Sequence, residues 1–149
     1  MSRCGRLHFV DLIIPSSVGP SVGRLLAEAG VEVAILFGSA ASGRMRPDSD
    51  TDIGILCQVA HDIGFDAELA LGANLERVIG REVDLVRLDK ASTLLRFEAS
   101  RGRCLYEARE SAFADFVARA LLEYEDLRPL LRRCAEGMFR RMKGAHDQA

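Results

Sequence analysis

The sequence predicts an α/β fold of the mixed α+β kind, in which a sheet is flanked by helices. Segments rich in branched apolar residues, as in buried strands, alternate with segments whose apolar residues recur at helical spacing. The 149 residues suit one compact sheet domain with a complete core. We assign this domain to residues 1–107, of which 1–19 are irregular, and a C-terminal helical extension to residues 108–149.

Each predicted element has a local signal. Pro20 suits the first turn of a helix, and Gly30 and Gly80 suit the position just after a helix end. Apolar residues at nearly every position indicate a buried strand at 31–37. A short strand around 9–14 is the alternative to irregular structure there. From residue 21 onward we expect a helix at 21–29, strands at 31–37 and 52–57, a helix at 65–79, a strand at 82–88, a helix at 93–100, a strand at 104–106 and a helix at 108–142.

The composition argues against several classes of protein. The formal net charge is −2, whereas a protein that mainly binds nucleic acid needs a basic face, so we expect no strong direct nucleic-acid binding. No apolar run is long enough to span a membrane, and no signal-peptide pattern is present. The four cysteines are scattered without a Cys-x-x-Cys pair, which makes the reducing cytoplasm the simplest location.

Three aspartates lie at or within apolar strand patterns. Asp50 and Asp52 are two residues apart, and such residues point to the same face of a strand. Asp84 lies among apolar residues of the next predicted strand. Adjacent carboxylates repel one another, and a divalent cation removes that penalty. If the two strands are neighbours, the sequence predicts a site for Mg²⁺ or Mn²⁺, with room for two ions.

Simpler interpretations of these aspartates exist. An Asp-x-Asp pair is common in solvated loops, and Asp84 alone could be a charge on an edge strand. Residues 48–52 also resemble the start of a calcium-binding loop, but Ile53 occupies the place of the turn glycine and Val59 that of the bidentate glutamate. The combination of the three aspartates with the Gly-Ser pair described next favours a metal site.

Gly38 and Ser39 follow the strand predicted at 31–37. Glycine lets a ligand approach the backbone closely, and successive amide groups bind anions, so this pair is a candidate phosphate cradle. The alternative is an ordinary turn at a strand end. Arg44 and Arg46, later in the same loop, could hold triphosphate oxygens or could simply be solvated, and the sequence leaves both possibilities open.

Gly38-Ser39, ten intervening residues and Asp50-x-Asp52 together resemble the signature of DNA polymerase β-like nucleotidyltransferases. The segment GREVDLVRL, with Asp84, is similar to the segment that carries their third carboxylate. The small size and the segment LLRFEASRGRCLYE resemble the minimal nucleotidyltransferase (MNT) antitoxins of HEPN/MNT toxin–antitoxin pairs. The resemblance covers most of residues 31–107. It departs directly after the Gly-Ser pair, where many relatives have a basic residue and this sequence has two alanines.

The resemblance implies a nucleotidyltransferase-type sheet and a transferase reaction. AMP, or another nucleoside monophosphate, would pass from a nucleoside triphosphate such as ATP to a hydroxyl, with release of pyrophosphate. Asp50 and Asp52 would bind both metals, and Asp84 would bind the metal next to the acceptor hydroxyl and could take its proton. Gly38 and Ser39 would hold the β- and γ-phosphates.

The same resemblance implies that the acceptor is a tyrosine of a partner HEPN toxin, which the modification silences. Two alternatives remain open at this point. One is an antitoxin that acts by binding alone, without catalysis. The other is a small-molecule nucleotidyltransferase of the aminoglycoside-modifying kind.

The C-terminal extension carries an apolar stripe with steps of four and three residues, which is typical of a helix that packs against another surface. Pro129 should kink or split this helix near Arg128. We expect the first half to pack on the sheet domain and the second half to bind the partner, with which the chain could form an oligomer. The stripe consists of Phe113, Val117, Ala120, Tyr124, Leu127, Leu131, Cys134 and Met138.

Overall fold

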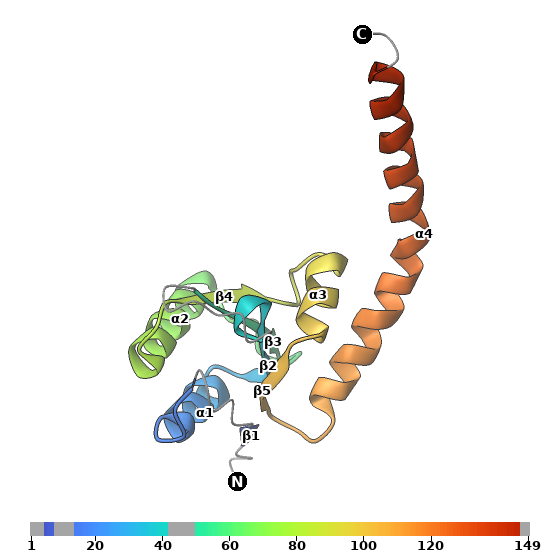
Figure 1. The fold of residues 1–149 in the computed structure, drawn as a ribbon. Coiled ribbons are helices and arrows are strands. Elements are labelled where there is room, and N and C mark those ends of the chain that lie inside the picture. Colours follow the sequence, from blue (N-terminus) through green and yellow to red (C-terminus); the bar gives the residue numbers. More distant parts are fainter. Residues whose placement is uncertain (1–4, 8–13, 42–49, 147–149) are drawn as a thin grey trace.

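The computed structural model describes residues 5–7, 14–41 and 50–146. Its centre is a five-stranded sheet with the strand order β1-β5-β2-β3-β4 (Figure 1). The pair β3–β4 is parallel and the other neighbouring pairs are antiparallel, so the sheet is mixed and the predicted fold class is confirmed. The strands are β1 (Arg6–Leu7), β2 (Val31–Phe37), β3 (Thr51–Cys57), β4 (Val83–Arg87) and β5 (Arg103–Glu107).

Helices cover both faces of this sheet. The helices α1 and α2 lie on one side of it, and α3 and the first half of α4 lie on the other (Figure 1). A short 3₁₀ turn, η1, follows β2 directly. These elements are α1 (Gly19–Glu28), η1 (Gly38–Ala40), α2 (Phe65–Ile79), α3 (Thr93–Ser100) and α4 (Ala112–His146). Among the helices in the described part of the chain, none combines the length and apolarity needed to cross a bilayer.

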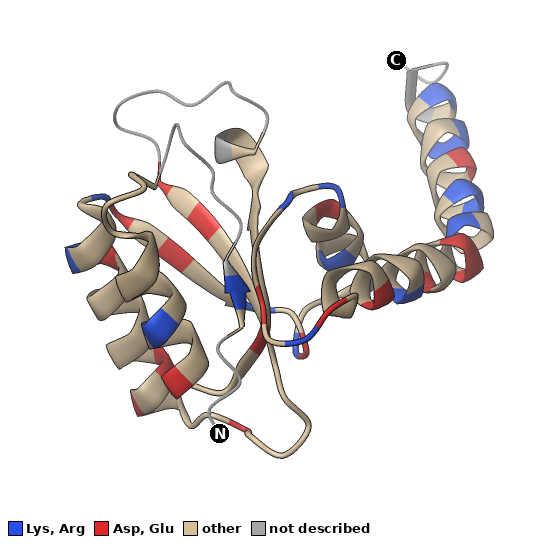
Figure 2. Ribbon diagram, turned by 90° about the horizontal axis from the view of Figure 1, so that it is seen from below, with Lys and Arg blue, Asp and Glu red and all other residues tan. Residues whose placement is uncertain are grey.

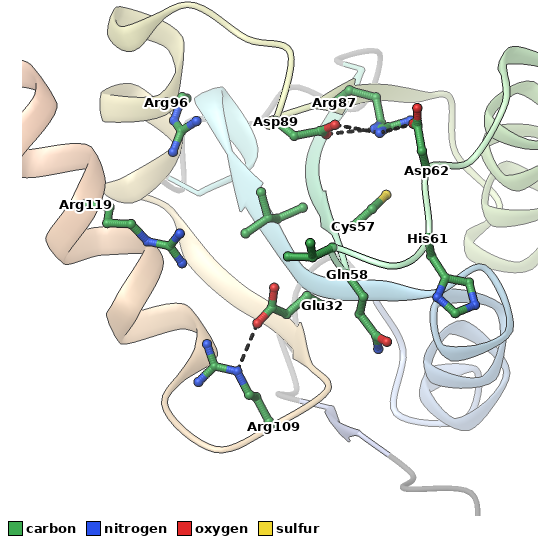
Figure 3. A pocket seen from close by; sticks show the side chains of 12 residues that line it. Glu32, Cys57, Gln58, His61, Asp62, Arg87, Asp89, Arg96, Arg109 and Arg119 are labelled. Atoms are coloured by element: carbon green, nitrogen blue, oxygen red, sulfur yellow. Dashed lines mark hydrogen bonds and ion pairs between the residues drawn. The ribbon is translucent and has the colours of Figure 1, made fainter.

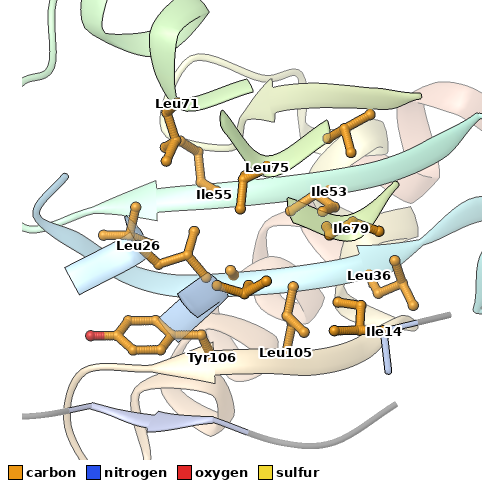
Figure 4. Close-up of a cluster of buried hydrophobic side chains, with 14 residues drawn as sticks. Ile14, Leu26, Leu36, Ile53, Ile55, Leu71, Leu75, Ile79, Leu105 and Tyr106 are labelled. Carbon is orange, nitrogen blue, oxygen red and sulfur yellow. The ribbon is translucent and has the colours of Figure 1, made fainter. Parts of the chain in front are cut away.

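Two hydrophobic clusters hold the layers together. The larger one joins α1 and α2 to the sheet, with Leu26 and Leu75 against Ile53 and Ile55 of β3 (Figure 4). All four side chains are fully buried, and each such burial stabilises the fold by about 2 kcal/mol. The smaller cluster lies on the opposite face, where Phe116 of α4 packs near β2. The sheet is therefore fixed from both sides near its middle.

The first half of α4 packs on the domain, whereas the second half does not. The Tyr124 ring stacks on Phe97 of α3 with centroids 3.8 Å apart, and the last fully buried residue among those described in α4 is Ala120. Pro129 lies inside α4, which remains one helix but changes direction about half way along (Figures 1 and 2). The predicted kink is therefore present without a split.

The element boundaries differ from the prediction in a few places. The last helix begins at Ala112 rather than at 108, because residues 108–111 form a turn in which Ser111 takes a positive φ of 68°. Strand β1, which pairs with β5, was not predicted. Of the alternative strand at 9–14, only Ile14 is described, and it is buried in the larger cluster.

Candidate active site

Two of the three predicted aspartates lie side by side in the sheet. Strands β3 and β4 are parallel neighbours, and their register places Asp52 directly opposite Asp84. Asp50 is exposed and comes just before the start of β3. The condition for a shared site, that these two strands be neighbours, is therefore met. Asp52 and Asp84 are thus neighbours near the beginning of β3 and β4, and Asp50 precedes Asp52 by two residues.

Gly38 brings the backbone into contact with this group. It follows β2, whose last residue, Phe37, pairs with Asp52 across the sheet. Its φ is +70°, which residues with a side chain rarely adopt, and a Cβ here would overlap Oδ2 of Asp52. A side chain at this position would be strained and would displace the Asp52 carboxylate, so glycine is favoured. Ser39 follows within the 3₁₀ turn, and the phosphate-binding role of the Gly-Ser pair remains a prediction.

The carboxylates of this site repel one another. The pKa of Asp52 is raised, first because the carboxyl group is partly buried and then because of the charges of Asp84 and Asp50. No Lys or Arg within the described residues forms an ion pair with any of these three aspartates. The site thus concentrates negative charge that the described part of the protein does not neutralise.

This donor set fits a hard divalent cation. Oxygen ligands suit Mg²⁺ and Mn²⁺, and a bound cation would offset the repulsion that raises the pKa of Asp52. The carboxylates do not enclose an ion as they stand, since the described ranges contain no group of three His, Cys, Asp or Glu side chains gathered around one point. Asp50, Asp52 and Asp84 could supply only part of a coordination shell, which leaves positions for substrate oxygens.

The two predicted phosphate-binding arginines, Arg44 and Arg46, lie outside the described residues. The structure instead places a different arginine near Gly38. A pocket of about 330 Å³ is lined by Phe37, Gly38, Ala41, Glu98, Arg101 and Gly102. Sequence reasoning missed Arg101, because it is more than sixty residues from Gly38 and only the pairing of β2 with β5 brings the two segments together.

A larger pocket, of about 460 Å³, lies at the other end of β3, near Cys57 (Figure 3). Cys57 follows Asp52 by five residues, which is roughly 17 Å along a strand. Arg87 lines this pocket and is almost completely buried, with 5% of its side chain exposed. Its guanidinium donates hydrogen bonds to Asp89 at 2.6 and 2.8 Å and to Asp62 at 3.0 Å.

The charges around Arg87 are therefore matched. Hydrogen bonds from Arg87 lower the pKa of both Asp62 and Asp89. A second exposed cluster joins Arg109 to Glu32 at 2.9 Å and to Asp115 at 2.8 Å. The buried cation of this pocket thus has acidic partners within the chain, whereas the three aspartates have no basic partner among the described residues. The end of the sheet that carries Asp50, Asp52 and Asp84 is therefore the better candidate for catalysis, although the pocket near it is smaller.

Comparisons with known proteins identify the family and the fold. The family described as Polymerase beta, Nucleotidyltransferase matches residues 23–111, a range that includes the Gly-Ser pair and all three aspartates. Curated proteins gave no match. The fold is similar to a crystal structure of a toxin–antitoxin with AMP-PNP, with a TM-score of 0.69, 24% identity, and coverage of 81% of this chain and 98% of the other.

A second similar structure is the tri-AMPylated Shewanella oneidensis HEPN toxin in complex with MNT antitoxin. The TM-score is 0.65 and the identity 22%, and the match covers 83% of this chain and 97% of the other. At these identities the likeness concerns the fold. The matched lengths show that the fold is shared over nearly the whole of each neighbour.

Proposed function

Because the chain belongs to the polymerase β nucleotidyltransferase family, we propose that it is an MNT antitoxin that transfers AMP from ATP to a hydroxyl of a partner HEPN toxin. The observation that carries this proposal is the register of β3 and β4, which pairs Asp52 with Asp84 beside the backbone of Gly38. One neighbour contains AMP-PNP and another contains an AMPylated HEPN toxin, which supports the nucleotide and the partner. We expect the reaction to take place in the cytoplasm.

In this proposal, one set of residues binds metal and another set binds phosphate. Asp50, Asp52 and Asp84 would hold Mg²⁺ or Mn²⁺, which when bound offsets the charge of the triphosphate and lowers the pKa of the acceptor hydroxyl. Backbone amides and the hydroxyl at Gly38-Ser39 donate hydrogen bonds to the β- and γ-phosphates. Arg44 and Arg46 would add contacts to the same phosphates from the loop.

The transfer itself forms one bond and breaks one. The acceptor oxygen, which we assign to a tyrosine of the toxin, attacks the α-phosphorus, and the bond from that phosphorus to the bridging oxygen of pyrophosphate breaks. The acceptor proton passes to the Asp84 carboxylate. The protein contributes mainly position and charge, because phosphoryl transfer needs little further covalent chemistry.

The second half of α4 is our proposed docking segment for the toxin. Beyond Pro129 its apolar side chains face solvent, and this half projects away from the sheet domain (Figure 2). Residues 130–146 also carry five Arg or Lys and one Glu, so the matching toxin surface should be apolar with an acidic rim. The exposed apolar residues are Leu130, Met138, Phe139 and Met142, at 56–67% exposure.

Removal of this segment tests the docking proposal. A chain ending at Pro129 should keep its melting temperature nearly unchanged, because none of the residues described beyond that point is buried. Its affinity for the toxin, measured by pull-down and titration, should fall by at least tenfold. A shortened chain that binds the toxin as well as the full chain would contradict the assignment of this segment. A large loss of melting temperature would show that the segment belongs to the core.

The catalytic proposal is tested by Asp50→Asn together with Asp52→Asn, using the toxin as acceptor and ATP labelled at the α-phosphate. The double variant should lose more than about 100-fold of the transfer rate, because the charge stabilisation supplied by the site is worth several kcal/mol. EDTA should abolish transfer by the wild type. Asp66→Asn, an exposed position on α2, is the matched control and should transfer normally.

The same variants distinguish the alternatives. If the double variant fails to transfer AMP but still protects cells from the toxin at native expression, neutralisation occurs by binding alone. If the wild type labels an aminoglycoside and not the toxin, the chain is a small-molecule nucleotidyltransferase. Either result would overturn the proposed function while leaving the family assignment intact.

A further inference from the structure

We infer that Arg101, in the turn between α3 and β5, binds the terminal phosphates of the nucleoside triphosphate. This inference rests on the proposed function and assigns a phosphate ligand outside the loop that contains Gly38 and Ser39. The pocket of about 330 Å³ beside Gly38 includes Arg101, the only cationic residue among the described residues that line it. Neither Asp52 nor Asp84 lines this pocket, so it lies beside the metal-binding group rather than within it.

The turn that carries Arg101 is fixed against the end of β2. A Cβ at Gly102 would overlap the backbone oxygen of Leu36, so the turn packs directly on the residues that lead into Gly38. The register of β2 with β5 places Leu36 opposite Arg103. Backbone hydrogen bonds from Arg101 to Glu98 (3.2 Å) and from Gly102 to Ala99 (3.0 Å) close the turn. Arg101 is thus held next to the Gly-Ser pair by the backbone of two strands.

The guanidinium of Arg101 is available for a ligand. Its ion-pair partner is Glu98, at a long distance of 3.9 Å, and 68% of the Arg101 side chain is exposed. An exposed ion pair of this length stabilises the protein little, and a ligand can easily replace Glu98 as the partner of the guanidinium. A triphosphate offers a stronger partner, since a guanidinium can donate two parallel hydrogen bonds to phosphate oxygens. Glu98 also lines the pocket, and its negative charge opposes an entering phosphate.

These positions predict which part of the nucleotide Arg101 contacts. The reacting α-phosphate belongs with the carboxylates of β3 and β4, whereas the pocket of Arg101 extends from the opposite flank of Gly38 toward α3. Arg101 should therefore interact with the β- or γ-phosphate and not with AMP. A variant of Arg101 that loses affinity for the triphosphate but not for AMP would therefore indicate phosphate binding, whereas a general effect on the fold would weaken the binding of both.

The test is calorimetric titration of the full chain with AMP-PNP and with AMP, both in Mg²⁺. Arg101→Ala should weaken AMP-PNP binding by about 10-fold or more, as expected for a charged hydrogen bond, and leave AMP binding unchanged. Arg103→Ala is the matched control, because Arg103 is an exposed arginine two residues away that does not line the pocket. Glu98→Gln should tighten AMP-PNP binding several-fold.

Each outcome decides the question. Equal losses in the Arg101→Ala and Arg103→Ala variants, or no loss in the first, would overturn the role of Arg101 while the wild type still binds AMP-PNP. A wild type that binds no AMP-PNP would overturn the proposed function and this inference with it. Arg101→Lys keeps the charge but not the paired donors, so it should fall between the wild type and Arg101→Ala. Circular dichroism checks that every variant is folded.

Discussion

The charged residues at the two ends of β3 are arranged in opposite ways. At its beginning, Asp52 meets Asp84 and Asp50, and burial and repulsion raise its pKa. At its other end, Arg87 lies between Asp62 and Asp89, and the pKa values of both carboxyl groups are lowered (Figure 3). The first arrangement disfavours the charged form of Asp52 in the folded protein, whereas the second favours the charged forms of Asp62 and Asp89.

This contrast separates a candidate functional site from a structural one. The arginine-rich pocket is the larger of the two and contains more ionisable groups, yet its buried cation is already satisfied by partners of the same chain. The aspartate group has no such partner among the described residues. Unbalanced charge, rather than pocket size, is therefore the basis on which we propose the aspartate end of the sheet as the active site.

The largest expected effect on stability comes from Arg87. Arg87→Met should lower the free energy of unfolding by about 2–3 kcal/mol in urea titrations, because it removes three charged hydrogen bonds from a buried side chain and leaves Asp89 without its partner. Arg109→Met is the matched control, since Arg109 forms two ion pairs of similar length at the surface. That variant should change little. Equal losses in both variants would remove the distinction between a buried and a surface network.

A smaller effect is expected from pH. The folded pKa of Asp89 is lowered, so the stability that it contributes is present above the unfolded pKa, near 3.9, and is lost as pH falls through the folded pKa. The wild type should therefore lose unfolding free energy on acidification below about pH 4. Asp89→Asn should reduce that pH dependence, as measured by urea midpoints between pH 7 and pH 3. An unchanged slope in the variant would mean that Arg87 gains nothing from the charge of Asp89.

The smallest effect, and one of opposite sign, is expected at Asp52. Its pKa is raised, so its charge disfavours the folded state above that pKa, and Asp52→Asn should leave the metal-free melting temperature unchanged or slightly higher. Mg²⁺ with AMP-PNP should raise the melting temperature of the wild type and not that of the variant. A clear drop for the metal-free variant would indicate that the Asp52 carboxylate is a structural element like Asp89.

Local signals in the sequence were sufficient for much of the fold. The strand at 31–37 and the helices at 65–79 and 93–100 occupy the predicted residues, and Gly30 and Gly80 take the positive φ that their helix-ending role requires. The aspartates and the Gly-Ser pair were also identifiable, because carboxylates in apolar strand patterns conflict with the local environment.

Features that depend on pairing between distant segments were not predictable in the same way. Nothing in the pattern of the strand at 82–88 shows that the loop that carries Asp62 and Ile63 covers Arg87 and makes it a buried cation. Arg101 lines the same pocket as Gly38 because β5 pairs with β2. Strand β1 is two residues long and has no periodicity to detect.

The parallel pairing of β3 with β4 has a consequence for how the protein folds. Strands β2 and β3 can pair across the loop between them, which brings Gly38 to Asp52. Asp84 joins them through a crossover by way of α2 that returns in the same direction, and pairing of this non-local kind is typically slow to form. A folding intermediate with only β2 and β3 paired would hold the Gly-Ser turn and two of the carboxylates but not the third. If the proposed site is correct, complete metal and nucleotide binding would then require the closed crossover, and its time course during refolding would report on that pairing.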